Sequence, residues 1–256
     1  MITTKSSREI ELMRAAGRIV ALAHEAVSEI IRPSLTTAMI AEVVERVIRE
    51  NGATPSFKGY FGFPSAACTS VNSTLVHGIP DDTPLKDGDI ISVDIGACYH
   101  GYHGDSAWTY AVGNVSDENL KLMEVTKQAL FEGLKFAKAG NHLSDISHAI
   151  GEYVYGHGYS IPRDYTGHGI GSQLHEDPSV PNFGSSGMGV VLKEGMCIAV
   201  EPMVHAGRPQ TKVLADDWTV VTKDGSWTAH YEHTILITKD GFEILTTTEG
   251  GTPDNG

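Results

Sequence analysis

The stretch IISVDIGACYHGYHGDSAWTYAV, residues 90–112, contains two apolar runs on either side of a polar, glycine-containing centre. This pattern predicts two antiparallel strands joined by a turn. If the chain turns at Tyr99-His100, Asp94 and Asp105 face each other directly, with Cβ atoms roughly 5 Å apart. Because strands disfavour aspartate, two carboxylates at these positions need a physical explanation.

A bound cation would supply that explanation. Two unpaired carboxylates in a dry site repel each other strongly, whereas a cation between them makes the arrangement favourable. Glu201 ends the apolar run CIAVE, and Glu232 lies in TAHYEHTILIT, where alternation places it on the opposite face from Tyr231 and His233. One such acid alone is usually a solvated surface group, but four at strand-like positions favour a metal site.

A nitrogen donor is available in the glycine-rich segment YTGHGIG, where the backbone can turn tightly around His168. A single loop histidine is more often a surface residue than a ligand. Four carboxylates with one neutral imidazole, however, nearly balance two divalent ions, and this ligand set suits Mn, Fe, Co or Zn. Two ions roughly 3.5–4 Å apart can share a hydroxide and polarise a carbonyl group.

The rest of the chain predicts helices and strands in a repeating order. Ser6 and Glu9 form a capping-box pattern, and apolar residues follow at three- and four-residue steps. Ser116 can cap a later helix. Helices are expected over about 7–31, 37–50, 116–137 and 144–155. Strands are expected over about 67–71, 90–96, 105–112, 196–204, 218–222, 228–238 and 242–245.

This order suggests an internal duplication, with halves at about 7–112 and 117–245 of one domain spanning 1–256. The segment LKDGDIISVDIG, from Leu85, can be laid over LKEGMCIAVEPM, from Leu192, so that Asp94 falls on Glu201. Twelve residues could also match by chance. The polar, glycine-rich end, residues 247–256, is expected to be a flexible tail.

Composition narrows the function classes. A formal charge of -13 disfavours a nucleic-acid surface and suits cationic ligands such as metals or a peptide ammonium group. No apolar run is long enough to span a membrane, and the N-terminus lacks the blocks of a signal peptide. Cys68, Cys98 and Cys197 lack CxxC spacing, which favours a reducing cytoplasm over a disulfide scaffold.

Five features together resemble type I methionine aminopeptidases: GHGIG, EPM, YEHT, VNSTLVHGIP and the spacing from Asp94 to Asp105. The resemblance extends from about Ser7 to Leu245. It implies an α/β (α+β) pita-bread fold, with pseudo-twofold halves around a dinuclear metal site. It also implies removal of the initiator methionine from nascent chains, preferentially before a small second residue, through a metal-held hydroxide.

The resemblance assigns roles to particular residues. It implies that Asp105 and Glu232 bridge two ions, that one ion also takes His168 and Glu201, and that the other takes Asp94. Glu201 would also pass a proton to the leaving amine. Two histidines would contact substrate, His77 at the scissile amide and His175 at the carbonyl and tetrahedral intermediate. The methionine pocket would consist of Phe57, Tyr60, Phe63, Cys68, Leu174 and Trp218.

Three positions depart from some relatives in ways that affect the shape of the pocket: Phe61, Leu174 and Gly96 replace histidine, an aromatic residue and threonine. Cys68 is expected to line the pocket rather than act as a nucleophile. The resemblance further implies a cytoplasmic monomer that associates transiently with ribosomes and has no DNA or membrane partner.

Two other functions fit parts of the sequence. A proline-specific peptidase of the same fold is one, although the chain shows no long domain before the first helix. The gap between His168 and Glu201 leaves no room for the helical insert of type II enzymes. A binding module that has lost catalysis is the other, although such a module need not keep all five metal ligands. Cleavage of Met-Ala-Ser against Xaa-Pro peptides would separate the first reading from the aminopeptidase.

Overall fold

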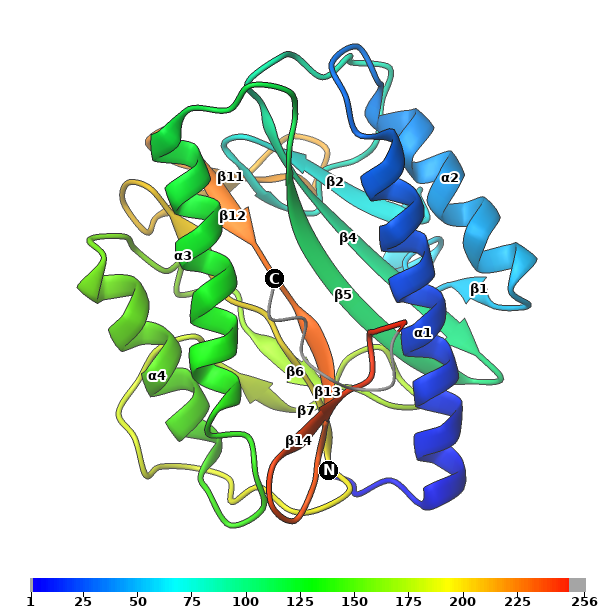
Figure 1. Ribbon diagram of the computed structural model, residues 1–256, viewed down its shortest axis with the longest axis vertical. Helices are drawn as coiled ribbons and strands as arrows, with labels where there is room; N and C mark the ends of the chain where they lie inside the picture. The colour runs from blue at the N-terminus through cyan, green and yellow to red at the C-terminus, as the bar shows by residue number, and fades with distance from the viewer. Residues whose placement is uncertain (1, 249–256) are drawn as a thin grey trace.

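The structure, a computed structural model, describes residues 2–248 and mixes helices with strands, which confirms the predicted α/β class (Figure 1). The first part of the chain forms α1 (Ser7–Ile30), α2 (Thr37–Glu50), β1 (Thr54–Pro55), the 3-10 turn η1 (Tyr60–Gly62), β2 (Ala67–Val71), β3 (Thr74–Val76), β4 (Ile90–Tyr99) and β5 (Tyr102–Ala111). The second part forms α3 (Asp117–Leu134), α4 (Leu143–Gly156), β6 (Gly167–Gly169), β7 (Glu176–Val180), β8 (Cys197–Val200), β9 (Met203–His205), β10 (Thr211–Val213), β11 (Val220–Thr222), β12 (Thr228–His230), β13 (His233–Ile237) and β14 (Phe242–Ile244). The duplication into halves at 7–112 and 117–245 stays a prediction.

The caps define where the helices begin. The Ser6 hydroxyl accepts the Glu9 N–H, and the Glu9 carboxylate accepts the Ser6 N–H, so both halves of the predicted capping box form at α1. Ser116 caps α3 as predicted. This helix ends at Leu134 rather than at 137, because Phe136 and Ala137 already bond to carbonyls three residues back and tighten the last turn.

Two larger antiparallel sheets carry most of the strands. In the first, β4 lies between β2 and β5 and also pairs with β1, while the second has the order β14-β13-β8-β6-β7. Two smaller sheets, β10-β11-β3 and β12-β9, complete the strand pairing. Among residues 2–248, no helix combines the length and hydropathy needed to cross a bilayer.

Strands β5 and β13 join the two larger sheets along a line that we call the seam, made by residues 105–107 and 232–234. Glu232 N–H donates to the Ala107 carbonyl at 2.8 Å, and Ser106 Oγ donates to the Glu232 carbonyl at 2.6 Å. Asp105 N–H donates to Thr234 Oγ1 at 3.0 Å. Figure 1 shows β5 and β13 between the α1–α2 pair and the α3–α4 pair. The seam therefore fixes the two sheets relative to each other.

The helices cover one face of these strands. A Cβ at Gly104 of β5 would lie 2.8 Å from the Gly17 Cα of α1, so helix and strand touch backbone to backbone. On β4, Val93 and Ile95 pack into the core that α1 and α2 share. Because side chains alternate along a strand, Asp94 and Asp105 project from the opposite face.

The register of the β4–β5 hairpin differs from the prediction. Asp94 pairs with Ala107, and Asp105 pairs with Gly96, so the two aspartates are diagonal neighbours rather than directly opposed. The turn lies at His100-Gly101, where both residues have positive φ (47° and 85°), as a tight type I′ hairpin requires. A register shift of two residues keeps both carboxylates on one face, where a cation could still bind between them.

Two long predicted strands are interrupted. The segment predicted over 196–204 separates into β8 and β9 at Glu201-Pro202, where proline has no N–H for the ladder. The segment predicted over 228–238 separates into β12 and β13 at Tyr231-Glu232. At both interruptions a glutamate, Glu201 or Glu232, lies between two strands rather than within one.

Three other strands differ in extent. The hairpin strands run longer, to Tyr99 and from Tyr102, and the strand predicted over 218–222 begins only at Val220. The N–H groups of Trp218 and Thr219 donate to the Asp216 carboxylate instead of a ladder. The predicted tail over 247–256 lies mostly at 249–256, outside the described residues. Within them, Thr248 Oγ1 donates to Glu25 at 2.6 Å.

Candidate metal centre and substrate pocket

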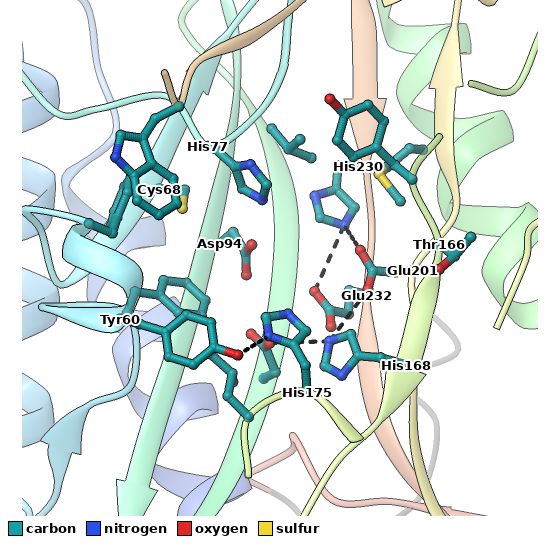
Figure 2. A pocket seen from close by; sticks show the side chains of 18 of the residues that line it. Tyr60, Cys68, His77, Asp94, Thr166, His168, His175, Glu201, His230 and Glu232 are labelled. Carbon is teal, nitrogen blue, oxygen red and sulfur yellow. Dashed lines mark hydrogen bonds and ion pairs between the residues drawn. The ribbon is translucent and has the colours of Figure 1, made fainter. Parts of the chain in front are cut away.

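One cavity of about 390 Å³ receives every site residue predicted from the sequence. It lies on the face of the strands away from the helices, and Figure 2 shows acids, imidazoles and rings converging on it. The predicted residues that line it are Phe57, Tyr60, Phe63, Cys68, His77, Asp94, Asp105, His168, Leu174, His175, Glu201, Trp218 and Glu232. Their placement together is observed, whereas their individual roles stay predictions.

Separate strands carry the four carboxylates. Asp94 lies on β4, opposite Cys68 of β2 on one side and Ala107 of β5 on the other. Asp105 lies on β5, Glu201 directly follows β8, and Glu232 lies between β12 and β13. Asp105 is 3% exposed and Glu232 is 1% exposed. Hydrogen bonds along the seam fix the backbones of Asp105 and Glu232, so these two side chains cannot easily move apart.

Three of these acids each keep one oxygen without a partner. Asp94 Oδ1, Asp105 Oδ1 and Glu232 Oε1 are buried and accept no hydrogen bond from any of residues 2–248. Unsatisfied buried carboxylate oxygens are costly, and native proteins rarely keep them without a ligand. The donor set fits divalent cations, because oxygens and imidazole nitrogens are the atoms that such ions bind.

The pKa values of the four acids also indicate a cation-binding site. Burial raises the pKa of Asp94 to about 7. Burial, followed by the charges of Asp94 and Glu201, raises the pKa of Asp105 well above its ordinary value. Burial also raises the pKa of Glu201 and, with help from Asp105, that of Glu232. We call these four carboxylates, from Asp94, Asp105, Glu201 and Glu232, the nest. Without a counter-charge the raised pKa values favour their protonated forms, whereas bound cations would stabilise the charged forms.

His168 presents a lone pair to the same nest. Its Nδ1 lies 2.9 Å from the Gly169 carbonyl, so Nδ1 carries the proton and Nε2 is left as an acceptor. That Nε2 lies 3.7 Å from Asp105 Oδ2 and 3.6 Å from Glu201 Oε1. Burial lowers the pKa of His168 to about 3, so the ring is neutral. A neutral nitrogen facing two carboxylates is the arrangement of a metal ligand.

Two further histidines flank the nest. Tyr60 Oη lies 2.8 Å from His175 Nδ1 and can donate to it, which leaves Nε2–H of His175 free to donate into the cavity (Figure 2). His77 has φ +58°, a left-handed conformation rare for residues other than glycine, and its ring lies edge-on to Trp218 at 6.3 Å. Backbone strain of this kind is typical of functional sites.

The apolar end of the cavity forms beside Asp94. Phe63 and Trp218 meet edge to face at 5.1 Å between centroids, and Cys68 and Leu174 belong to the same buried cluster. Burial raises the pKa of the Cys68 thiol, which favours the neutral thiol over the thiolate. We call this apolar end, lined by Phe63, Cys68, Leu174 and Trp218, the slot. An unbranched apolar side chain suits it.

Sequence reasoning missed several lining residues, notably His230, Tyr165 and Met203, whereas Phe61, which it related to the pocket shape, does line the cavity. Phe61 is 85% exposed with φ +46°, at the mouth of the cavity. His230 precedes Glu232 by two residues, so strand alternation alone could have placed it on the same face. The sequence gives no comparable signal for Tyr165 or Met203, because only the folded chain brings their segments to the cavity.

Comparisons with known proteins agree with this geometry. Residues 11–239 match metallopeptidase family M24. Methionine aminopeptidase 1 of Bacillus subtilis is 56% identical over 246 residues, covering 96% of this chain and 99% of the relative. A solved methionine aminopeptidase from Thermotoga maritima is 47% identical with a TM-score of 0.95, over 96% of this chain and 100% of that one. A prolidase from Pyrococcus furiosus is 27% identical with a TM-score of 0.79, and the match spans 66% of its length.

Proposed function

The chain belongs to metallopeptidase family M24, and from this premise we propose that it is a metalloaminopeptidase that removes the N-terminal methionine of peptides and nascent proteins. One observation carries the proposal: a nest of unpartnered buried carboxylates opens directly onto an apolar slot. The nest suits hydrolysis of a peptide bond and the slot suits methionine. Similarity to relatives named methionine aminopeptidase supports the same substrate.

Metal ions would be held by the carboxylates and imidazole already described: Asp94, Asp105, His168, Glu201 and Glu232. Two divalent ions bound there would polarise the scissile carbonyl and supply a nucleophile at neutral pH. Asp105 and Glu232 would be the ligands shared by both ions, since they are the least exposed of the four acids and their backbones meet at the seam. The ligand set leaves Mn, Fe, Co and Zn as candidates.

The chain's own groups would then guide the reaction. His175, held by Tyr60, donates Nε2–H to the carbonyl oxygen as negative charge develops on it. Glu201 would take up the proton that the attacking water loses and deliver it to the leaving amine. His77 orients the scissile amide. The slot around Phe63 and Cys68 holds the thioether in place.

We also propose a preference for a small second residue. Tyr60 lies against His175, with ring centroids 5.3 Å apart, and Tyr165 lies 6.4 Å from His77. These rings flank the two histidines that would contact the scissile bond. A bulky side chain after methionine would meet them, whereas glycine, alanine or serine would not.

The protein would act as a cytoplasmic monomer on nascent N-termini. Cys68, Cys98 and Cys197 are all free thiols, which agrees with a reducing compartment. A single chain lines the whole cavity, so no second copy is needed to complete it. Nascent chains as substrates make transient contact with ribosomes part of the same proposal, whereas DNA and membranes have no part in it.

A peptide assay tests the proposal. Protein purified without added metal is analysed for metal content, then loaded with Mn, Fe, Co or Zn and offered Met-Ala-Ser and Xaa-Pro peptides. Release of methionine from Met-Ala-Ser, with little release from Xaa-Pro peptides, is the expected result. Fast cleavage before proline without release of methionine would instead identify a prolidase-like enzyme.

A further inference from the structure

His230 is a buried imidazole in the metal nest that the resemblance to other enzymes does not assign. It ends β12, is 1% exposed and faces the cavity with Nε2 (Figure 2). Within the described part of the chain, this Nε2 has no hydrogen-bond partner. The backbone is fixed, since His230 N–H donates to Thr109 Oγ1 and its carbonyl accepts from the same hydroxyl. The ring is therefore held in place with one nitrogen unused.

The surroundings of His230 match those of His168. His230 Nε2 lies 3.5 Å from Glu201 Oε2 and 3.8 Å from Glu232 Oε2. His168 Nε2 lies 3.6 Å from Glu201 Oε1 and 3.7 Å from Asp105 Oδ2. Each imidazole thus faces two carboxylates at nearly equal separations. Glu201 takes part in both arrangements and presents a different oxygen to each ring.

These separations suit a shared cation better than a hydrogen bond. An N–H···O hydrogen bond has its heavy atoms about 2.9–3.0 Å apart. Two donors that each lie about 2.1 Å from one ion are about 3.4 Å apart when the angle at the ion is tetrahedral. Glu201, His230 and Glu232 each offer a ligand atom within 4.8 Å of the others, and Asp105, His168 and Glu232 do the same.

We propose that His230 is a second imidazole ligand of the metal centre and binds through Nε2 beside Glu201 and Glu232. The inference rests on the proposed function, because it concerns the same dinuclear site. The centre would then have four carboxylates and two imidazoles. A further neutral ligand adds affinity without changing the charge balance of the nest.

X-ray absorption of the zinc-loaded protein tests this without a variant. Two imidazoles distributed over two ions give about one imidazole per zinc in the multiple-scattering signal. Glu201, Glu232 and the other acids contribute only oxygen. About half an imidazole per zinc, with two zinc ions bound, would overturn the inference.

His230→Gln and His230→Ala separate ligation from hydrogen bonding. Glutamine keeps an N–H donor, so it would preserve metal affinity if His230 only oriented Glu201. For a ligand, both variants should weaken calorimetric affinity for one ion by at least about tenfold and halve the imidazole signal. Affinity restored by glutamine, with an unchanged signal, would contradict the proposal.

His205→Gln is the matched control. His205 is also buried with an unpartnered Nε2, and it lies on β9, the strand that pairs with β12, but it does not line the cavity. Its substitution should leave both readouts unchanged. A protein that binds two zinc ions and releases methionine, yet shows half an imidazole per zinc, would lose the His230 assignment alone. A protein that binds no metal would lose the proposed function as well.

Discussion

Buried polar groups on the two faces of β5 differ in how completely they are hydrogen-bonded. On the helix-covered face, His24 of α1 uses both ring nitrogens, Nδ1 with Tyr110 Oη at 2.8 Å and Nε2 with the Ser106 carbonyl at 2.9 Å. On the cavity face one residue earlier, Asp105 leaves an oxygen without a partner. The same strand thus carries a completed polar network on one side and an incomplete one on the other.

This difference separates structural polarity from functional polarity. A completed network stabilises the fold and requires nothing further. Several buried acids without partners around one cavity destabilise the fold until a ligand binds, so such a cluster indicates a binding site. Another completed hydrogen bond lies on the same side as His24, where His233 Nδ1 is 2.7 Å from Thr246 Oγ1. Changes on the cavity face should therefore act on metal binding and rate, and changes on the helix face on stability.

The largest effect is expected from the bridging acids. Asp105→Asn or Glu232→Gln should lower kcat/KM by at least about 10³-fold, roughly 4 kcal/mol of transition-state stabilisation, and reduce metal content. Steady-state kinetics and metal analysis check this. Asp145→Asn is the control, because that carboxylate is fully engaged at the α4 N-terminus and should leave turnover unchanged. Full turnover by either cavity variant would count against the bridging roles.

Metal removal should destabilise the protein, since the cavity carboxylates then repel one another. One ion at a concentration about 100 times its Kd stabilises the native state by about 2.7 kcal/mol, and a second adds to this. For a chain of this size, 2.7 kcal/mol corresponds to roughly 5–10 °C in Tm, so removal of both ions should lower Tm by at least that much. Scanning calorimetry before and after adding metal back measures it. An unchanged Tm after strict chelation would remove the argument from repulsion.

His175→Ala should lower kcat by about 10²-fold, also near 2.7 kcal/mol, because an oxyanion donor is lost. Tyr60→Phe removes only the hydroxyl that orients His175 and should have a smaller effect in the same direction. Single-turnover and steady-state rates with Met-Ala-Ser distinguish the two. If His175→Ala changed only KM, the histidine would contribute to binding rather than to the transition state.

On the helix face, acid should weaken the fold through His24. Burial lowers the pKa of His24 to about 4, so its contribution to stability is complete above about pH 6.5 and is lost as the pH falls towards 4. Between about pH 6.5 and pH 5 the loss is about 2 kcal/mol. Denaturant titration of metal-free wild type and His24→Gln measures the free energy of unfolding of each. The difference in favour of wild type should fall by that amount as the pH is lowered from about 6.5 to 5. Parallel pH curves for the two proteins would contradict the prediction.

The smallest effect is expected where glycine makes room for the slot. A Cβ at Gly96 would lie 2.7 Å from Phe57 Cε1, so Gly96→Thr should displace the Phe57 ring. KM for a methionine peptide should rise about fivefold, near 1 kcal/mol, with kcat less affected. Gly241→Thr, at a site with open space around the added atom, is the control. An unchanged KM would mean that Phe57 does not shape the slot.

Much of the fold could be predicted because its signals are local. The Ser6–Glu9 box and the three- and four-residue apolar spacing lie within each helix, and the helix boundaries came out within a few residues. The hairpin was predicted two residues out of register, because the turn depends on His100 adopting a positive φ beside Gly101. Short strands such as β6 were missed, since their glycines give no β pattern.

The acids of the site could be predicted because charge on a buried strand is anomalous within its own segment. Asp94 and Glu232 stand out for that reason alone. His230 did not stand out, because histidine is common on strands and its empty Nε2 is visible only after Glu201 arrives from another sheet. What sequence reasoning misses is therefore the partner that a residue lacks, a property of the assembled structure.

The seam also has a consequence for the order in which the protein matures. Its hydrogen bonds join residues 125–129 positions apart, such as Ala107 with Glu232 and Asp105 with Thr234. During synthesis from the N-terminus, the first half can collapse early, but the cation nest cannot exist until residues beyond 232 have left the ribosome. Ion capture must then be a late event that locks a nearly finished polypeptide, and a truncated product would be inert rather than partly active.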